Sequence, residues 1–263
     1  MPRDPFDYAG RRVLVTGCAS GIGRAAARLL VEAGAEVAGI DWQDCDLPLS
    51  SFTRLDLRDQ IAIDRFASTL AAPVEALFNC AGMAPMHPWR DVMAVNFIGL
   101  RQLTRAIAET MPPGSAIVSV GSNGGANWRD RLAELRAFVA TPSFDAAFAW
   151  CEANEAPQAN AYSFAKEAVV VWTMAEAAGL IARGIRINCT SPGAVQTPML
   201  DAIAEVVPAD RMDIVCQPSG RRSSPDEQAW TLLMLNSAFA SYVTGVDLPV
   251  DGGFIAGRRL ATG

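Results

Sequence analysis

The sequence contains a single histidine, and this scarcity excludes several kinds of chemistry. His87 lies between two prolines in the stretch APMHPWR, where we expect a solvated loop residue. Hydrolysis by a serine–histidine pair would have to use this one residue, and a histidine-rich metal site cannot be built. We therefore expect histidine not to carry the chemistry, and we predict no metal site.

Other signals are also missing. The six cysteines show no CxxC spacing, which indicates reduced thiols and a cytoplasmic location. There is no run of ~18 uncharged apolar residues, so we expect no membrane span. The first ten residues carry early acids and do not look like a signal peptide. A net charge of −6 disfavours a nucleic-acid-binding surface.

What is present indicates an α/β protein. The 263 residues are 51% hydrophobic and 19% charged, which suits a single domain over residues 1–263. Short apolar runs alternate with helix-forming segments, a pattern typical of a doubly wound parallel sheet with helices on both faces. We predict seven strands, within residues 11–17, 35–41, 52–57, 74–82, 115–122, 185–193 and 245–253. We predict the main helices within residues 21–34, 58–72, 92–111, 162–184 and 224–237.

A glycine-rich stretch, VTGCASGIGRAA, joins the first predicted strand to the first predicted helix. Gly17, Gly21 and Gly23 would let the backbone approach a pyrophosphate at the helix N-terminus, as in a Rossmann-type fold. Asp41 ends the next strand, 20 residues after Gly21, where a carboxylate accepts hydrogen bonds from a ribose and repels a 2′-phosphate. Loops also collect glycine for conformational reasons, and Asp41 could be an ordinary turn residue. The combined pattern favours NAD.

The stretch NAYSFAKEAVVVWT places Tyr162 and Lys166 four residues apart at the start of a predicted helix. Residues with this spacing share one helix face. A phenol titrates near pH ~10, and a neighbouring positive charge favours its ionised form. The spacing is therefore compatible with an ordinary surface pair and with an acid or base that works near neutral pH.

Short motifs along residues 10–256 occur in an order that resembles the short-chain dehydrogenase/reductase family. They are TGCASGIG at 16–23, NCAG at 79–82, Asn96 in VNFIG, Ser122 in IVSVGS, Tyr162 with Lys166, SPG at 191–193 with Thr197, and VDGG at 250–253. The family pattern has a second asparagine where this chain has Cys80, a departure that we expect to be structural. The segment before Tyr162 and the tail at 220–253 most resemble the branch of 3α-hydroxysteroid dehydrogenase/carbonyl reductase and coniferyl-alcohol dehydrogenase.

The resemblance implies a role for each of four residues. Tyr162 would be the acid/base, and Lys166 would lower the tyrosine pKa and bind the nicotinamide ribose. Ser122 would orient the substrate oxygen. Asn96 would help hold a water that relays the proton outward. General acid–base catalysis favours such a pKa moved toward the working pH.

The resemblance also implies a cofactor site for NAD, in which Thr197 and the backbone near Val195 bind the carboxamide. Cys80 and Cys189 are expected to be buried, inert thiols. The predicted cofactor-binding residues are Gly17, Ser20, Gly21, Ile22, Gly23, Asp41, Asp56, Leu57, Asn79, Ala81, Gly82, Tyr162, Lys166, Pro192, Gly193, Val195 and Thr197.

Forty positions separate Ser122 from Tyr162, which indicates an insertion at about 126–157. It should contain two short amphipathic helices, at 127–140 and 143–155, and we hypothesise that it caps the substrate mouth. Its aromatic residues could equally form a core of their own; they are Trp128, Phe138, Phe144, Phe148 and Trp150. A second candidate lid, the substrate loop at about 195–222, contains Leu200, Ile203, Met212 and Ile214.

These features predict an NAD-dependent oxidoreductase that interconverts a hydrophobic, ring-bearing alcohol and its carbonyl. A hydroxysteroid, an aryl alcohol or an allylic alcohol would suit such a site. The family further implies a homodimer or a homotetramer. The alternative is a non-catalytic dinucleotide-binding sensor or scaffold, because a fold does not prove a function.

Overall fold

A seven-stranded parallel sheet forms the centre of the computed structural model, which describes residues 7–70 and 72–261. The seven predicted strands and their parallel arrangement are confirmed. The strands lie side by side in the order β3-β2-β1-β4-β5-β6-β7. Their bounds are β1 Arg12–Thr16, β2 Glu36–Asp41, β3 Ser51–Arg54, β4 Ala76–Asn79, β5 Ala116–Val120, β6 Arg186–Pro192 and β7 Asp247–Val250.

From β1, the strands β2 and β3 are added toward one edge of the sheet, and β4 to β7 are added toward the other edge, so the order reverses between β1 and β4. Thr16, the last residue of β1, is in register with Asn79, the last residue of β4. The chain leaves these neighbouring strands toward opposite faces of the sheet, so a crevice opens beyond their carboxyl ends. The sheet topology therefore places a ligand site where the glycine-rich stretch follows β1.

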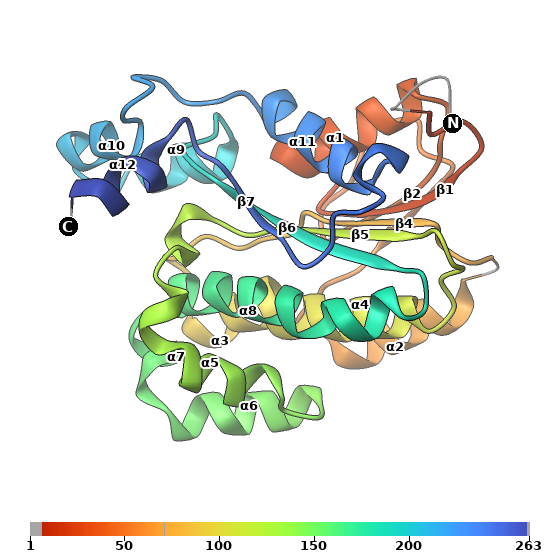
Figure 1. The fold of residues 1–263 in the computed structure, drawn as a ribbon, viewed down its shortest axis with the longest axis horizontal. Helices are drawn as coiled ribbons and strands as arrows, with labels where there is room; N and C mark the ends of the chain where they lie inside the picture. Colours follow the sequence, from red (N-terminus) through yellow and green to blue (C-terminus); the bar gives the residue numbers. More distant parts are fainter. Residues whose placement is uncertain (1–6, 71, 262–263) are drawn as a thin grey trace.

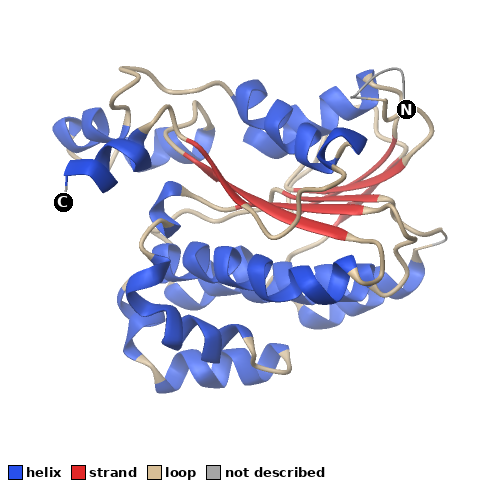
Figure 2. Ribbon diagram, in the orientation of Figure 1, coloured by secondary structure: helices blue, strands red, loops and turns tan. Residues whose placement is uncertain are grey.

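Helices cover both faces of the sheet (Figures 1 and 2). One face carries α1 and α11, and the other carries α2, α4 and α8. Every residue of β4 and β5 is buried, as expected of strands that are covered on both sides. The helices span α1 Gly21–Glu32, α2 Gln60–Thr69, α4 Gly99–Ala108, α8 Ala161–Ile181 and α11 Pro225–Asn236, followed by a 3₁₀ turn at Ala238–Ala240.

The single helix predicted over 92–111 consists of three consecutive elements. An α-helical turn, α3 (Trp89–Met93), leads into a π-helical turn at Ala94–Ile98, and α4 follows. π-Helical turns widen a helix locally and occur frequently at functional sites. The widened turn contains Asn96.

Residues 126–157 form an additional helical layer beneath α8 (Figure 1). The two predicted helical segments are confirmed, and Thr141 and Pro142 separate them as expected. The layer follows the 3₁₀ turn Asn123–Gly125 and comprises a 3₁₀ turn at Trp128–Arg131, α5 Leu132–Val139, α6 Phe144–Ala153 and the start of α7 Glu155–Ala159.

Three short helices lie beyond the carboxyl ends of the strands, on the left in Figure 1. They are α9 Pro198–Ala204, α10 Ala209–Val215 and α12 Phe254–Ala261. The chain returns from α10 to the sheet through α11, whose start is fixed by a capping box between Ser224 and Glu227. Within the described part of the chain, no helix combines the length and apolar character needed to cross a bilayer.

Candidate active site

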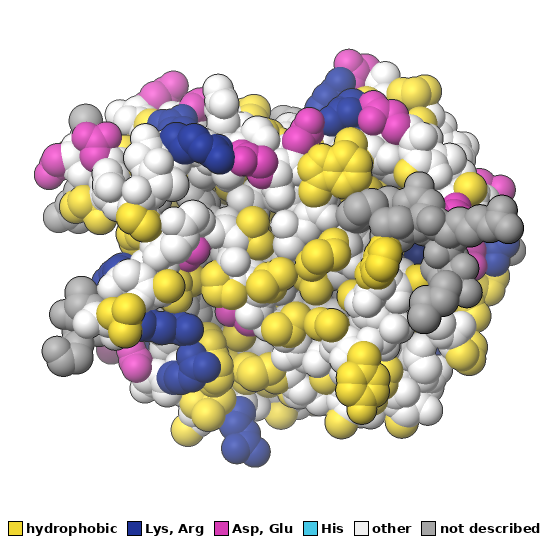
Figure 3. Space-filling model, turned by 45° about the horizontal axis from the view of Figure 1, so that its top comes forward, with side chains coloured by type: hydrophobic (Ala, Val, Ile, Leu, Met, Phe, Trp, Pro, Cys, Tyr) yellow, Lys and Arg dark blue, Asp and Glu magenta, His cyan; other side chains and the backbone are white. Residues whose placement is uncertain are grey.

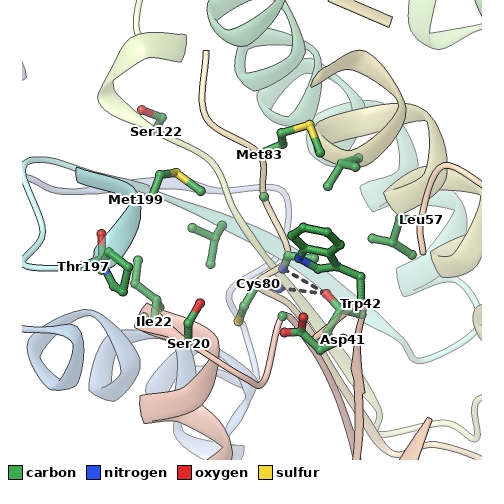
Figure 4. Close-up of a pocket in the computed structure, with 18 of the residues that line it drawn as sticks. Ser20, Ile22, Asp41, Trp42, Leu57, Cys80, Met83, Ser122, Thr197 and Met199 are labelled. Atoms are coloured by element: carbon green, nitrogen blue, oxygen red, sulfur yellow. Dashed lines mark hydrogen bonds between the residues drawn. The ribbon is translucent and has the colours of Figure 1, made fainter. Parts of the chain in front are cut away.

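A cavity opens at the carboxyl ends of the strands, between the glycine-rich loop and α9. Figure 4 shows side chains from both sides pointing into it. Fifteen of the predicted site residues line this cavity. They are Gly17, Ser20, Gly21, Ile22, Asp41, Asp56, Leu57, Ala81, Gly82, Ser122, Tyr162, Lys166, Pro192, Val195 and Thr197.

The glycine-rich loop packs directly on the loop that follows β4. Gly17 has a φ of 71°, and a Cβ at this position would lie 2.7 Å from the backbone of Ala81. Only glycine combines that backbone conformation with so close an approach. Thr16 ties the two loops together, because its Oγ1 accepts hydrogen bonds from the N–H groups of Cys80 and Ala81, both at 3.1 Å (Figure 4).

The N-terminus of α1 faces the same cavity. Ser20 caps the helix without a side-chain hydrogen bond to its backbone, so the first turn keeps N–H groups for a ligand. Gly21 has a φ of 54° and lines the cavity. A helix N-terminus of this kind binds a pyrophosphate through N–H groups and the helix dipole.

Asp41 ends β2 beside this helix terminus and is almost fully buried. Its Oδ2 accepts a hydrogen bond of 2.9 Å from Ala19 N, and its Oδ1 accepts one of 3.0 Å from Gln43 N. These bonds hold the carboxylate at the cavity wall, where it retains lone pairs for ribose hydroxyls. The loop, the helix terminus and Asp41 together fit a nicotinamide dinucleotide.

Trp42 and Met83 are among the cavity residues that were not predicted from the sequence. Trp42 follows Asp41 and is 59% exposed, and Met83 follows Gly82 in the loop after β4. Both line the cavity (Figure 4). Each lies directly after a predicted cofactor-binding residue, Asp41 at the end of β2 and Gly82 in the loop after β4, a signal that could have identified them.

Tyr162 and Lys166 line the other end of the cavity with Ser122. The helix α8 begins at Asn160, whose Oδ1 accepts a hydrogen bond of 3.1 Å from Ser163 N. This cap fixes the first turns of the helix, so that Tyr162 and Lys166 face the same side. Lys166 Nζ lies 5.8 Å from the centroid of the Tyr162 ring and donates a hydrogen bond of 2.9 Å to Val120 O.

Burial has opposite effects on the two titrating groups. It raises the pKa of Tyr162, and a hydrogen bond from Ser122 opposes this rise. It lowers the pKa of Lys166 to about 8, against the influence of Cys80 and Cys189. Lys166 is not among the causes of the change in the Tyr162 pKa, and its ammonium group bonds Val120 O, so the expectation that Lys166 lowers the tyrosine pKa stays a prediction.

Four predicted residues lie outside the cavity lining: Gly23, Asn79, Asn96 and Gly193. Asn96 is buried in the π-helical turn, where its Oδ1 accepts a hydrogen bond of 2.8 Å from Met83 N. Its Nδ2 donates one of 2.9 Å to Met83 O. Asn79 Nδ2 donates to Thr104 Oγ1 and Ser119 Oγ. Asn96 therefore holds the backbone of Met83 in place, and Asn79 links side chains of α4 and β5. Direct contact of either asparagine with a cofactor stays a prediction.

The two glycines outside the lining have tight packing instead. A Cβ on Gly23 would lie 2.1 Å from Gly17 O, and a Cβ on Gly193 would lie 2.9 Å from Asp251 Cα. Both positions admit only glycine in this packing. Their contact with a cofactor stays a prediction.

The apolar end of the cavity is supplied by the loop after β4 and by α9. Met83 comes from the former, and Met199, Leu200 and Ile203 come from the latter. α9 belongs to the predicted substrate loop, whose contact with a substrate stays a prediction. Among the described residues, none of 126–157 lines the cavity, so the hypothesis that the insertion caps the substrate mouth is wrong.

The aromatic residues of the insertion pack against the far side of α8. Phe138 is fully buried, with its ring centroid 5.1 Å from that of Phe97, 5.0 Å from that of Trp150 and 5.3 Å from that of Phe164. These rings form one core with α8 and with the π-helical turn before α4. The alternative of a structural core is therefore the one that the packing supports.

Other reactive side chains stay outside the candidate chemistry. Cys189 is buried as expected, whereas Cys80 is half-buried and lines the cavity. Loss of solvent raises the pKa of the Cys80 thiol to about 12 and that of Cys189 well above its ordinary value, which keeps both as neutral thiols. His87 is exposed and lies outside the cavity lining, as expected for a loop residue.

Comparison with known proteins agrees with this geometry. Residues 11–134 match the family model described as short chain dehydrogenase, and residues 149–255 match the one described as enoyl-(acyl carrier protein) reductase. The coniferyl-alcohol dehydrogenase of Pseudomonas sp. (strain HR199 / DSM 7063) is 32% identical over 249 residues, which cover 94% of this chain and 98% of the relative. The chain belongs to the short-chain dehydrogenase/reductase family.

Further members of the family are similar over the same length. The 3-alpha-hydroxysteroid dehydrogenase/carbonyl reductase of Comamonas testosteroni is 31% identical over 94% of this chain and 97% of its own. The structure of the 3-alpha-hydroxysteroid dehydrogenase from Pseudomonas sp. B-0831 complexed with NADH has a TM-score of 0.81 and 29% identity, covering 95% of this chain and 98% of that one. A putative gluconate 5-dehydrogenase from Beutenbergia cavernae with bound NADP has a TM-score of 0.77 and 28% identity, covering 96% and 100%.

This short-chain dehydrogenase/reductase is therefore an oxidoreductase that binds a nicotinamide dinucleotide and acts on alcohols or carbonyls. The resemblance to the coniferyl-alcohol and 3α-hydroxysteroid dehydrogenase branch is confirmed. The alternative of a non-catalytic sensor finds no support among these relatives, which are named as dehydrogenases and reductases.

Proposed function

We propose that the protein is an NAD-dependent dehydrogenase/reductase of uncharged, ring-bearing alcohols and their carbonyls. The observation that carries this proposal is the arrangement of one cavity, with Asp41 at one end and Ser122, Tyr162 and Lys166 at the other. The first end suits an adenosine ribose, and the second suits an alcohol or carbonyl group.

Tyr162 is proposed as the general acid/base. Because burial raises its pKa, the phenol is protonated at neutral pH, the state that donates a proton to a carbonyl during reduction. In alcohol oxidation the same oxygen takes the proton, and this direction gains from higher pH. When bound, the nicotinamide supplies or accepts the hydride.

The neighbouring polar residues are proposed to position the reactants. Ser122 Oγ accepts a hydrogen bond of 3.0 Å from Gly124 N, and its hydroxyl donates a long bond of 3.4 Å to Asn123 Oδ1, which a substrate oxygen would replace. Lys166 stands beside Tyr162 and would bind the nicotinamide ribose. Asn96 fixes the backbone of Met83 and would support a proton-relay water.

Asp41 supports the choice of NAD over NADP. A 2′-phosphate beside this buried carboxylate would bring like charges together in a region of low dielectric, which is unfavourable. Because the similar structures named above include one with NADH and one with NADP, they do not decide between the two cofactors. The proposal of NAD therefore rests on Asp41.

The substrate class follows from the apolar end of the cavity. Met83, Met199, Leu200 and Ile203 offer a surface for rings, and methionine side chains adapt to aromatic and alicyclic shapes. Among the residues that line this end of the cavity, Lys166 is the charged one, and it is proposed to bind the nicotinamide ribose. No charged side chain of this lining is therefore left to bind a charged substrate. An uncharged hydroxysteroid, aryl alcohol or allylic alcohol would fit this surface.

The test is a panel of steroid, aryl and terpenoid alcohols, each assayed with NAD and with NADP by NADH or NADPH absorbance. The proposal predicts turnover of at least one ring-bearing alcohol, with a higher kcat/KM for NAD. Faster turnover of carboxylate-bearing or small aliphatic alcohols would contradict the substrate class, and a higher kcat/KM for NADP would contradict the role of Asp41.

We also propose a cytoplasmic homodimer or homotetramer. All six cysteines are free thiols, which suits a reducing compartment. Large exposed hydrophobic side chains follow α11 at Phe239, Tyr242 and Val243, and Figure 3 shows hydrophobic side chains gathered across the middle of one face. Light scattering coupled to a sizing column would test the assembly, and a monomeric mass would contradict it.

A further inference from the structure

Glu167 is a buried carboxyl that the proposed chemistry does not use. It follows Lys166 on α8 and is 3% exposed. Its Oε2 has no hydrogen-bond partner among the described residues, although Arg131 Nε lies 3.3 Å away. A buried and incompletely hydrogen-bonded carboxylate destabilises a fold, so its presence beside a catalytic candidate needs an explanation.

The carboxyl of Glu167 faces the insertion. The charged groups around it are Arg131 and Asp130 from the 3₁₀ turn at Trp128–Arg131 and Glu134 from α5. Arg131 is the favourable partner, and its guanidinium carbon also lies 5.9 Å from the centroid of the Phe164 ring on α8. Arg131 thus contacts α8 at Phe164 and at Glu167, which precede and follow Lys166 in the sequence.

Gly125, the residue before the insertion, lies directly on the backbone of α8. A Cβ on Gly125 would lie 2.8 Å from Lys166 C and 3.0 Å from Glu167 N. Gly125 N donates a hydrogen bond of 2.9 Å to Ser122 O, and Gly124 N donates one of 3.0 Å to Ser122 Oγ. A continuous set of contacts therefore leads from Ser122 through Gly125 to the Lys166–Glu167 peptide.

We propose that Glu167, paired with Arg131, is a positioning residue that holds the Ser122–Arg131 segment against α8 and keeps Ser122 in place beside Tyr162. This inference rests on the proposed function of Ser122 and Tyr162. The pair acts through the backbone, since Glu167 does not line the cavity. When the carboxylate is neutralised, the segment stays packed on α8, but the attraction to Arg131 that orients the segment is lost.

The titration of Glu167 gives the pair a pH dependence. Burial raises the pKa of Glu167 to about 7, against the opposing influence of Arg131 and with the support of Asp130 and Glu134. Above pH 7 the residue is a carboxylate and pairs with Arg131, and below pH 7 it becomes a neutral acid. The proposal therefore expects turnover to fall on the acid side of pH 7.

Stability should change in the opposite direction. The folded protein holds a proton on Glu167 at pH values where the unfolded chain, with an ordinary pKa of 4.5, has lost it. This contribution to stability is fully present below pH 4.5 and is lost as the pH rises through about 7. A group that only supports the fold would not lower activity over the range in which it raises stability.

The experiment compares the wild type with Glu167→Gln, which keeps the size of the side chain and cannot ionise. At pH 8 we expect kcat to fall about fivefold, a modest effect for misplaced reacting groups, with the KM for NAD unchanged. The acid limb near pH 7 should disappear from the kcat profile, while the melting temperature at pH 8 should not fall. Arg131→Gln should lower kcat similarly, and Arg131→Lys should restore part of it.

Asp130→Asn is the matched control, because Asp130 is exposed and belongs to the same segment. It removes one negative charge, and we expect it to keep kcat within about twofold, as for a surface substitution. A Glu167→Gln enzyme with wild-type kcat and a wild-type acid limb would overturn the proposal. So would a loss of kcat that accompanies a lower melting temperature and that Asp130→Asn reproduces.

A second readout separates this inference from the proposed function. Hydrogen-exchange protection of the backbone N–H groups of Gly124, Gly125, Ala126 and Asp130 needs no turnover. In the wild type, the protection factors should increase as the pH falls below 7, where neutral Glu167 stabilises the packed segment, and in Glu167→Gln they should not change across pH 7. If no alcohol is turned over but this pattern holds, the proposed function fails and the positioning pair stands. Equal protection in both proteins at pH 8 would refute the pair.

Discussion

The two sides of α8 face different surroundings. One side presents Tyr162 and Lys166 to a cavity bordered by Ser122 and α9. The other side packs Phe164 and Glu167 against the insertion, where aromatic rings fill the space. The insertion lies between Ser122 and Tyr162 in the sequence. In the structure, however, it packs on the side of α8 that faces away from the cavity.

This difference separates two contributions to activity. Residues on the cavity side are expected to decide which substrate and cofactor react. Residues on the insertion side are expected to decide how firmly the helix and the Ser122 turn are held, and thus to affect all substrates alike. The following substitutions test this separation, from the largest expected change in free energy to the smallest.

Phe138→Ala should give the largest effect, and the effect should be on stability. The ring is fully buried among three other aromatic rings, so its removal leaves a cavity that costs ~3–5 kcal/mol. Thermal or denaturant unfolding measures this loss, and Phe148→Ala, at a half-buried position of the same layer, is the control with a smaller loss. A loss under about 0.5 kcal/mol, the size seen for surface changes, would show that the layer does not share the core of α8.

Tyr162→Phe should abolish most turnover without a comparable loss of stability. The substitution keeps the ring and removes the transferable proton, so kcat should fall by at least ~100-fold, the low end for general acid–base catalysis. Titration of NADH fluorescence should give nearly unchanged binding. Near-native turnover would remove Tyr162 from the mechanism and with it the catalytic importance of the cavity side.

Much of this arrangement could be predicted from the sequence because parallel strands bring their carboxyl ends to one edge. Gly17, Asp41, Ala81 and Ser122 each follow or end a strand, so a correct strand assignment also placed them together. The i, i+4 spacing placed Tyr162 and Lys166 on one side of α8 in the same way.

Tertiary packing decided the features that the sequence did not reveal. The insertion packs on one side of α8 because Phe138 contacts residues of other helices. The local periodicity of the sequence does not predict such contacts. The π-helical turn at Ala94–Ile98 and the burial of Glu167 also arise from packing. The aromatic residues of the insertion led to the cap hypothesis because they lie close to Ser122 and Tyr162 in the sequence. In the structure they pack into the core beside α8.

Asp41→Ser should change cofactor choice by a smaller amount. Removal of one carboxylate from the ribose end should narrow the ratio of kcat/KM between NAD and NADP about tenfold, which corresponds to ~1.4 kcal/mol. Steady-state kinetics with both cofactors measures this ratio. The neighbouring Asp44→Ser, at an exposed position of the same loop, should leave it unchanged. An unaltered ratio in Asp41→Ser would place cofactor selection elsewhere.

The most direct test of the separation measures substrate preference on both sides of α8. Met199→Ala removes apolar surface from the cavity, and Trp128→Ala removes a half-buried ring from the insertion. The measured quantity is the ratio of kcat/KM between a ring-bearing alcohol and a small alcohol. Met199→Ala should lower this ratio about tenfold, within the range for a lost apolar contact, and Trp128→Ala should leave it at the wild-type value. A ratio that falls in Trp128→Ala and stays unchanged in Met199→Ala would contradict the account.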